Sequence, residues 1–217
     1  MSMVTVNNKF ISNKRSHDIV LASASPRRAK LLEQLNWCPK ISAVDIDESV
    51  HAGEMATDYC LRMAEEKSIE AQKNMQTSFP SISLPIITAD TIVVIDDQIL
   101  GKPIDKEDAV LTLVKLSGRE HQVYSAVSVW HAGQCKTILS TNAVKMSDIS
   151  EAQMMAYVAT GEPMDKAGAY GIQGYAAMWI ELINGSYSSI MGLPLFETTA
   201  LLHEMGIMSP LELLKDS

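Results

Sequence analysis

Two arginines stand in the first turn of a predicted helix, where acidic residues are usually favoured. They end the segment Ser23 to Arg28, in which Ser25-Pro26 is typical of an N-cap followed by proline at the first helical position. The helix dipole disfavours cations at this end, whereas the free N–H groups attract anions. A phosphate held by Arg27, Arg28, the helix amides and the hydroxyls of Ser23 and Ser25 would reverse the penalty. Two solvated arginines beside an ordinary cap are the alternative that the segment leaves open.

A lysine and an aspartate also break the patterns around them. Apolar residues recur with helical spacing over 54–75, and Lys67 falls on the same face of this predicted helix. Asp90 interrupts a β-branched strand predicted over 86–95, where a buried carboxylate would need a cation, a metal or a lysine beside it. Two other placements stay open: Lys67 could extend to solvent, and Asp90 could lie at an exposed strand end.

Three further polar residues lie in predicted loops within reach of a ligand. Lys102 sits between a glycine and a proline that constrain its backbone, so its side chain is free to extend. Glu48 ends an acidic cluster after a predicted strand over 41–44, and its hard oxygens suit Mg²⁺ or Mn²⁺, although such loops are commonly solvated surface. Gln173 lies in the glycine-rich segment 161–174, where its amide could read a base edge or be ordinary polar surface.

The elements that must position these residues alternate along the chain. Strands are predicted over 19–22, 41–44, 86–95, 99–100, 122–130, 136–144 and 178–183. Helices are predicted over 25–35, 54–75 and 105–116, from Ser147 or Asp148 to 159, and after Pro194. This order favours a mixed α/β fold with a curved, partly antiparallel sheet. We expect a polar extension over 1–16 and one folded unit over 17–217, with two lobes around a cleft as one possible form.

Composition limits the partners and the compartment. With 217 residues and a formal net charge of -8, the chain lacks the basic surface of a general binder of nucleic acid or anionic membrane. Three scattered cysteines without a CxxC pair indicate neither a disulfide framework nor a thiolate zinc site, which fits a reducing cytoplasm. No apolar run or signal-peptide pattern predicts membrane association. The P-loop, the dinucleotide-binding GxGxxG, HExxH and GxSxG are absent as well.

Taken in order, the polar residues lie in blocks that resemble the Maf family of nucleoside triphosphate pyrophosphatases. The matching blocks are LASASPRRAKLLEQL at 21–35, DIDE at 45–48, EEK at 65–67, TADTIV at 88–93, LGKP at 100–103, LSGREHQVYSAV at 116–127, GEPMDKAGAYGIQG at 161–174 and INGSYSSIMGLPLFET at 183–198. Their order and spacing match over nearly the whole chain after about residue 17, which is far more specific than any one block.

The resemblance implies a two-lobed fold like that of the inosine triphosphatase group, with an elongated curved mixed sheet and a central nucleotide cleft. It implies metal-dependent cleavage of a nucleoside triphosphate to the monophosphate and pyrophosphate. Asp90 would be the proton acceptor and a metal ligand with Glu48, under Mg²⁺ or Mn²⁺. Ser23, Arg27, Arg28, Lys67 and Lys102 would form the phosphate-binding set, and either lysine would keep Asp90 ionised.

The same resemblance favours the branch that acts on dTTP and UTP. Arg27, Thr91 and Gln173 match positions associated with substrate choice in that branch, so Thr91 and Gln173 are expected to read the pyrimidine edge. Two alternatives stay open: a 7-methyl-GTP pyrophosphatase of the same family, and a nucleotide-binding inhibitor of septum formation and cell division. A homodimer is a further expectation from the resemblance.

Overall fold

The computed structural model describes residues 18–78 and 84–213, and the expected polar extension over 1–16 lies outside these residues. Its centre is one mixed sheet with the strand order β2-β1-β3-β5-β6-β7, and β4 pairs with β3 off this path. The strands are β1 (Ile19–Leu21), β2 (Pro39–Ile41), β3 (Ile86–Ile95), β4 (Gln98–Leu100), β5 (Glu120–His131), β6 (Gln134–Met146) and β7 (Ile180–Asn184). The pairings β1–β2 and β1–β3 are parallel and the others antiparallel, so the predicted mixed α/β fold is confirmed.

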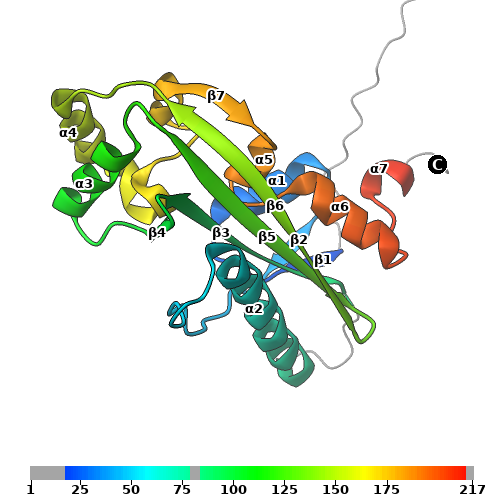
Figure 1. Ribbon diagram of the computed structural model, residues 1–217. Coiled ribbons are helices and arrows are strands. Elements are labelled where there is room, and N and C mark those ends of the chain that lie inside the picture. Colours follow the sequence, from blue (N-terminus) through cyan, green and yellow to red (C-terminus); the bar gives the residue numbers. More distant parts are fainter. Residues whose placement is uncertain (1–17, 79–83, 214–217) are drawn as a thin grey trace, which may run out of the picture.

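Helices cover both faces and one end of this sheet (Figure 1). They are α1 (Pro26–Gln34), α2 (Ala56–Ser78), α3 (Lys106–Leu116), α4 (Glu151–Ala159), α5 (Tyr187–Ile190), α6 (Leu195–Glu204) and α7 (Pro210–Leu213). Thr88 of β3 donates its hydroxyl to the Ala64 carbonyl, which places α2 on one face of β3. Alternate residues such as Ile87 pack with Leu201 of α6 on the other face, as the period-two geometry of a strand requires.

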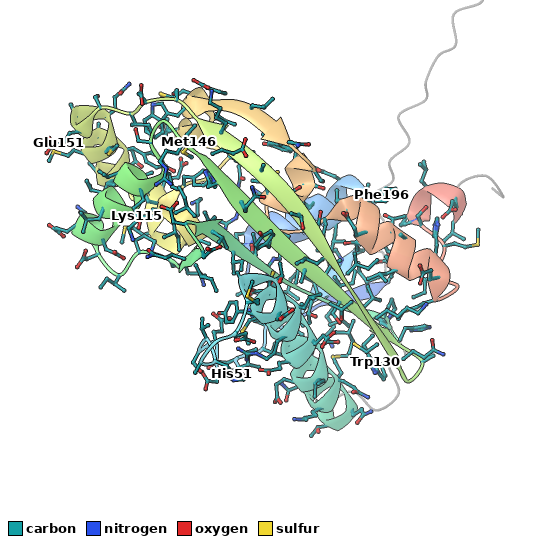
Figure 2. The ribbon with its side chains drawn as sticks, viewed as in Figure 1. His51, Lys115, Trp130, Met146, Glu151 and Phe196 are labelled. Carbon is teal, nitrogen blue, oxygen red and sulfur yellow. The ribbon has the colours of Figure 1, made fainter. Side chains whose placement is uncertain are left out.

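The β5–β6 hairpin forms the long axis of the sheet. Figure 2 shows Trp130 near the tip of this hairpin and Met146 at its opposite end, beside α4. Separate apolar clusters lie along it: one joins β1, α1 and α6, and another joins the far end of β3 with α3 and α4. The division into two lobes stays a prediction. Among the helices of the described residues, none combines the length and the apolar character of a membrane span.

Several boundaries differ from the sequence predictions for identifiable reasons. The strand expected over 41–44 lies at Pro39–Ile41, because its register follows parallel pairing with β1. The strand expected over 178–183 begins at Ile180, since the preceding residues form a short 3-10 helix that buries Trp179. Ser147 does not start α4, because its N–H donates to the Trp179 carbonyl.

The true N-cap of α4 is Ser150. Its hydroxyl accepts from the backbone N–H of Gln153, and the Gln153 side chain accepts in return from the Ser150 N–H. This reciprocal capping box satisfies two helix-end N–H groups at once, so the helix begins there and not at Ser147 or Asp148. The segment 161–174, expected to lack regular structure, contains two short 3-10 helices, Glu162–Asp165 and Ala167–Ala169.

Candidate active site

A break in strand pairing opens one edge of β3. On that edge β1 pairs only with Ile86 and Ile87, and β4 pairs only from Val93 onward. In the described part of the chain, the stretch 88–92 between them has no strand partner on this side, while β5 pairs with the other side throughout. Side chains from both faces of β3 can therefore reach the same opening, which places Asp90 and Thr91 in one cleft although successive residues point to opposite faces.

A cavity of about 660 Å³ lies at this open edge. It is lined by all ten residues that the sequence singled out: Ser23, Ser25, Arg27, Arg28, Glu48, Lys67, Asp90, Thr91, Lys102 and Gln173. They come from six separate parts of the chain, at 23–28, 48, 67, 90–91, 102 and 173. The fold therefore brings together residues that are up to 150 positions apart, from 23 to 173. The volume lies within the range of ordinary small-molecule sites.

Lys67 of α2 lies at the centre of an ionic triad. Its Nζ is 2.7 Å from Asp90 Oδ1 and 2.6 Å from Glu48 Oε1, and the side chains of Lys67 and Asp90 are only 12% and 13% exposed. The alternatives in which Lys67 extends to solvent or Asp90 lies at an exposed strand end are thus ruled out. A largely buried ammonium between two carboxylates keeps them together despite their mutual repulsion.

The electrostatics of Glu48 follow from this arrangement. Burial raises the pKa of Glu48, but the hydrogen bond and charge of Lys67, followed by the charges of Lys102 and Arg28, outweigh it and lower the pKa overall. The loop that carries Glu48 is tied to α2, because the Tyr59 hydroxyl donates to the Glu48 carbonyl at 2.9 Å. Glu48 is therefore an ionised carboxylate on an anchored backbone.

Arg28 is the deeper of the two arginines at the start of α1. Its Nε donates to the Gly192 carbonyl at 2.8 Å, and a terminal nitrogen donates to Ser23 Oγ at 3.0 Å. Ser25 is the N-cap, as predicted, but its side chain makes no capping hydrogen bond and the first turn holds no acidic residue. The helix end therefore presents N–H groups and two guanidiniums to the cavity, which is a favourable arrangement for an anion.

Two charged residues of the cavity were missed by the sequence reasoning. Asp165 accepts a hydrogen bond from Arg27 at 2.8 Å, and its neighbour Lys166 contacts the same carboxylate at 2.6 Å. Both lie in the segment 161–174 that the family resemblance covers, but only Gln173 was selected from it. The signal in the sequence was the pair Asp165-Lys166, an acidic and a basic residue side by side in a glycine-rich segment.

The segment that carries Gln173 is held by buried polar contacts. The Tyr157 hydroxyl donates to Glu162 Oε1 at 2.9 Å and accepts from the Gly171 N–H at 3.2 Å. Behind the cavity, the Tyr170 hydroxyl lies 2.7 Å from His121 Nε2, and burial lowers the pKa of His121 to about 4. Gln173 itself is exposed, so its amide is available to a ligand. The contacts of Tyr157 and Tyr170 hold the backbone of its segment in place.

Gly168 ties the same segment to the loop of Lys102. Its N–H donates to the Gly101 carbonyl at 3.1 Å, its φ is +69°, and a Cβ there would lie 2.8 Å from a Val93 methyl carbon. We expect Gly168→Ala to lower the free energy of unfolding by about 2–4 kcal/mol, combining left-handed strain with overpacking. Urea unfolding would measure this.

The matched control for that substitution is Gly133→Ala. Gly133 also has a positive φ, +82°, but no atom lies within 4 Å of the added Cβ. This control isolates the backbone strain, about 1–2 kcal/mol. Equal losses in the two variants would contradict close packing at Gly168.

The donor set at Glu48 and Asp90 bears on metal binding. Among the described residues, no group of three or more His, Cys, Asp and Glu side chains could enclose an ion. Two carboxylates on one side of a cavity fit Mg²⁺ nonetheless, because Mg²⁺ is commonly held by one or two carboxylates together with substrate phosphates. The two carboxylates therefore suit an ion that is also held by the phosphates of a bound ligand.

Comparison with known proteins gives one consistent result. Residues 18–205 match the family described as Maf-like protein. A nucleoside triphosphate pyrophosphatase of Haemophilus ducreyi is 49% identical over 87% of this chain and 95% of its own length. The dTTP/UTP pyrophosphatases of Methylobacillus flagellatus and Neisseria meningitidis are 47% and 44% identical over 88% and 91% of this chain, and 94% and 98% of their own lengths. The chain therefore belongs to the Maf-like protein family.

Proposed function

We propose that this protein hydrolyses dTTP and UTP to the nucleoside monophosphate and pyrophosphate. The observation that carries the proposal is the convergence of Arg27, Arg28, Lys67 and Lys102 with two carboxylates on a single cavity. A triphosphate carries close to four negative charges, and its hydrolysis depends mainly on holding those charges and aligning water. The names of relatives that match nearly their whole length support the same reaction.

The proposed mechanism gives each part of the cavity one task. Arg27, Arg28 and the N-terminal amides of α1 hold phosphate oxygens, and Lys102 extends to the same charges from the loop after β4. Asp90 accepts a proton from the water whose oxygen forms the new bond to the α-phosphorus. The bond between this phosphorus and the bridging oxygen breaks, and pyrophosphate leaves with the bonding electron pair. Lys67 keeps Asp90 oriented through their 2.7 Å contact.

A divalent cation, Mg²⁺ or Mn²⁺, is part of the proposal. Glu48 and Asp90 would hold it, since each carboxylate has one oxygen on Lys67 and a second oxygen beyond that contact. When bound, the ion neutralises charge that develops on the departing pyrophosphate. Thr91 and Gln173 are proposed to read the pyrimidine base.

Cytoplasmic localisation belongs to the proposal as well. Its support is that Cys60 and Cys135 carry free thiols, which suits a reducing compartment. The homodimer stays a prediction.

The direct test is pyrophosphate release with and without Mg²⁺. We expect kcat/KM for dTTP and UTP to exceed that for CTP and 7-methyl-GTP by at least about tenfold, because a site built for one hydrogen-bond pattern leaves polar groups unpaired on another. Chelation of the ion by EDTA should abolish release. Preference for 7-methyl-GTP would assign the protein to the other substrate class of the family. Nucleotide binding without any release would favour a binding protein instead.

A further inference from the structure

The Thr91 hydroxyl stands at the cavity end of a buried chain of hydrogen bonds. Thr91 of β3 pairs directly with Ser125 of β5, so both side chains lie on the same face of the sheet. Their hydroxyl oxygens are 2.8 Å apart. Ser125 Oγ lies in turn 2.7 Å from the Ser189 carbonyl oxygen in α5. Ser125 is 0% exposed, whereas Thr91 lines the cavity.

The direction of the protons in this chain follows from the Ser189 carbonyl. A carbonyl oxygen can only accept, so the single hydroxyl proton of Ser125 is donated to Ser189. The contact between Ser125 and Thr91 then requires the proton of Thr91. The Thr91 hydroxyl therefore donates inward, away from the cavity, and only its lone pairs remain for a ligand.

The acceptor at the end of the chain is fixed by further contacts. Ser189 is buried, and its own hydroxyl accepts from Asn142 Nδ2 at 2.8 Å. The other end of the Asn142 amide, Oδ1, accepts from the Ser186 N–H at 2.7 Å, at the N-cap of α5. Asn142 is 1% exposed on β6. These contacts hold the Ser189 backbone against the sheet, where its carbonyl also accepts from the Gly192 N–H at 2.9 Å. Reversal of the hydrogen-bond chain would leave no proton between Ser125 Oγ and this carbonyl oxygen, so their lone pairs would face each other at 2.7 Å.

An acceptor-only Thr91 discriminates between parts of a nucleotide. Phosphate oxygens at neutral pH are acceptors, so they would meet Thr91 lone pair to lone pair, and the phosphates belong at the arginines instead. The nucleoside part carries donors. Uracil and thymine present an imide N–H at N3, whereas cytosine presents an unprotonated acceptor at the same position.

We propose that Ser125 is a positioning residue that fixes Thr91 as a hydrogen-bond acceptor, and that this polarity selects a base with an imide N–H over cytosine. The inference rests on the proposed hydrolysis of pyrimidine nucleoside triphosphates. Ser125 touches no ligand and acts through Thr91. The expected signature is a change in the ratio of kcat/KM for UTP to kcat/KM for CTP, which simple loss of folded protein would not move.

The main experiment measures this ratio in the wild type, Ser125→Ala and Ser128→Ala. In Ser125→Ala the Thr91 hydroxyl loses its acceptor, can rotate and can donate to cytosine, so we expect the ratio to fall about tenfold. Ser128 is the matched control, because it is also a fully buried serine of β5 but its hydroxyl contacts Thr137 and Cys135 outside the cavity. Ser128→Ala should keep the wild-type ratio.

A second variant keeps the inference testable if Ser125→Ala does not fold. Thr91→Val removes the hydroxyl with little change of shape, and the ratio should again fall. Adding Ser125→Ala to Thr91→Val should then change the ratio no further, because Ser125 would act only through the missing hydroxyl.

The outcomes separate this inference from the proposed function. A wild type that prefers UTP, with an unchanged ratio in Ser125→Ala or in Thr91→Val, overturns the inference alone and would fit a sugar hydroxyl at Thr91. A wild type that hydrolyses UTP and CTP equally also overturns it. Absence of pyrophosphate release from every nucleotide overturns the proposed function, and the inference with it.

Discussion

Asp90→Asn is expected to lower the turnover of dTTP by at least about a thousandfold while nucleotide binding stays within a few-fold of wild type. General-base catalysis contributes roughly 10²–10⁴ in rate, and an amide of the same shape cannot take up the proton. The amide oxygen can still accept from Lys67, so the 2.7 Å contact at the cavity centre need not be lost. Single-turnover release of pyrophosphate and calorimetric titration with dTTP would measure the two effects separately.

Asp96→Asn is the matched control for this substitution. Asp96 directly follows the same strand β3, but its 63% exposed side chain pairs with Arg119 outside the cavity. We expect wild-type turnover from it. Near wild-type release of pyrophosphate by Asp90→Asn would refute the proposed role of Asp90 as proton acceptor.

Lys67→Met is expected to reduce kcat/KM by at least about a hundredfold. The substitution keeps most of the side-chain volume but removes the cation between Glu48 and Asp90, and loss of one partner leaves half-buried carboxylates unpaired. Because the Lys67 hydrogen bond and charge oppose the effect of burial on Glu48, the pKa of Glu48 should rise in the variant. Glu48 would then be protonated at higher pH than in the wild type.

Lys67→Met should shift the acid limb of the pH profile to higher pH. Activity that needs ionised Glu48 is present above its pKa and lost as the pH falls through it, so a raised pKa moves the acid limb of kcat/KM to higher pH. A pH profile of the variant against Lys73→Met would test this, since Lys73 lies on the same helix with a 66% exposed side chain. If the two variants had the same acid limb and the same kcat/KM, the triad would have no part in catalysis.

Local signals in the sequence were strong enough to define several elements. The helix predicted over 105–116 is confirmed as α3, and Asp105 is its N-cap, whose side chain accepts from the Asp108 N–H. Ser25-Pro26 likewise begins α1. Such caps depend on residues within one turn, so the chain carries the information locally. The four-residue helix α5 was missed, because an element this short has no hydrophobic period and only its Ser186 cap could have indicated it.

By itself, the sequence singled out the residues proposed to carry the chemistry, because Arg27, Arg28, Lys67 and Asp90 each break a local rule that a ligand or partner would relieve. The tertiary structure decided how they combine. Periodicity places Lys67 on the apolar face of α2, but only packing against β3 brings its ammonium to Asp90. The short pairings of β1 and β4 leave the edge of β3 open, and this opening lets residues on opposite faces share one cavity.

The orientation of the Thr91 hydroxyl also depends on the tertiary structure. It is set by Ser125 and Ser189, which lie 34 and 98 positions after residue 91, and no local pattern in the sequence connects the three residues.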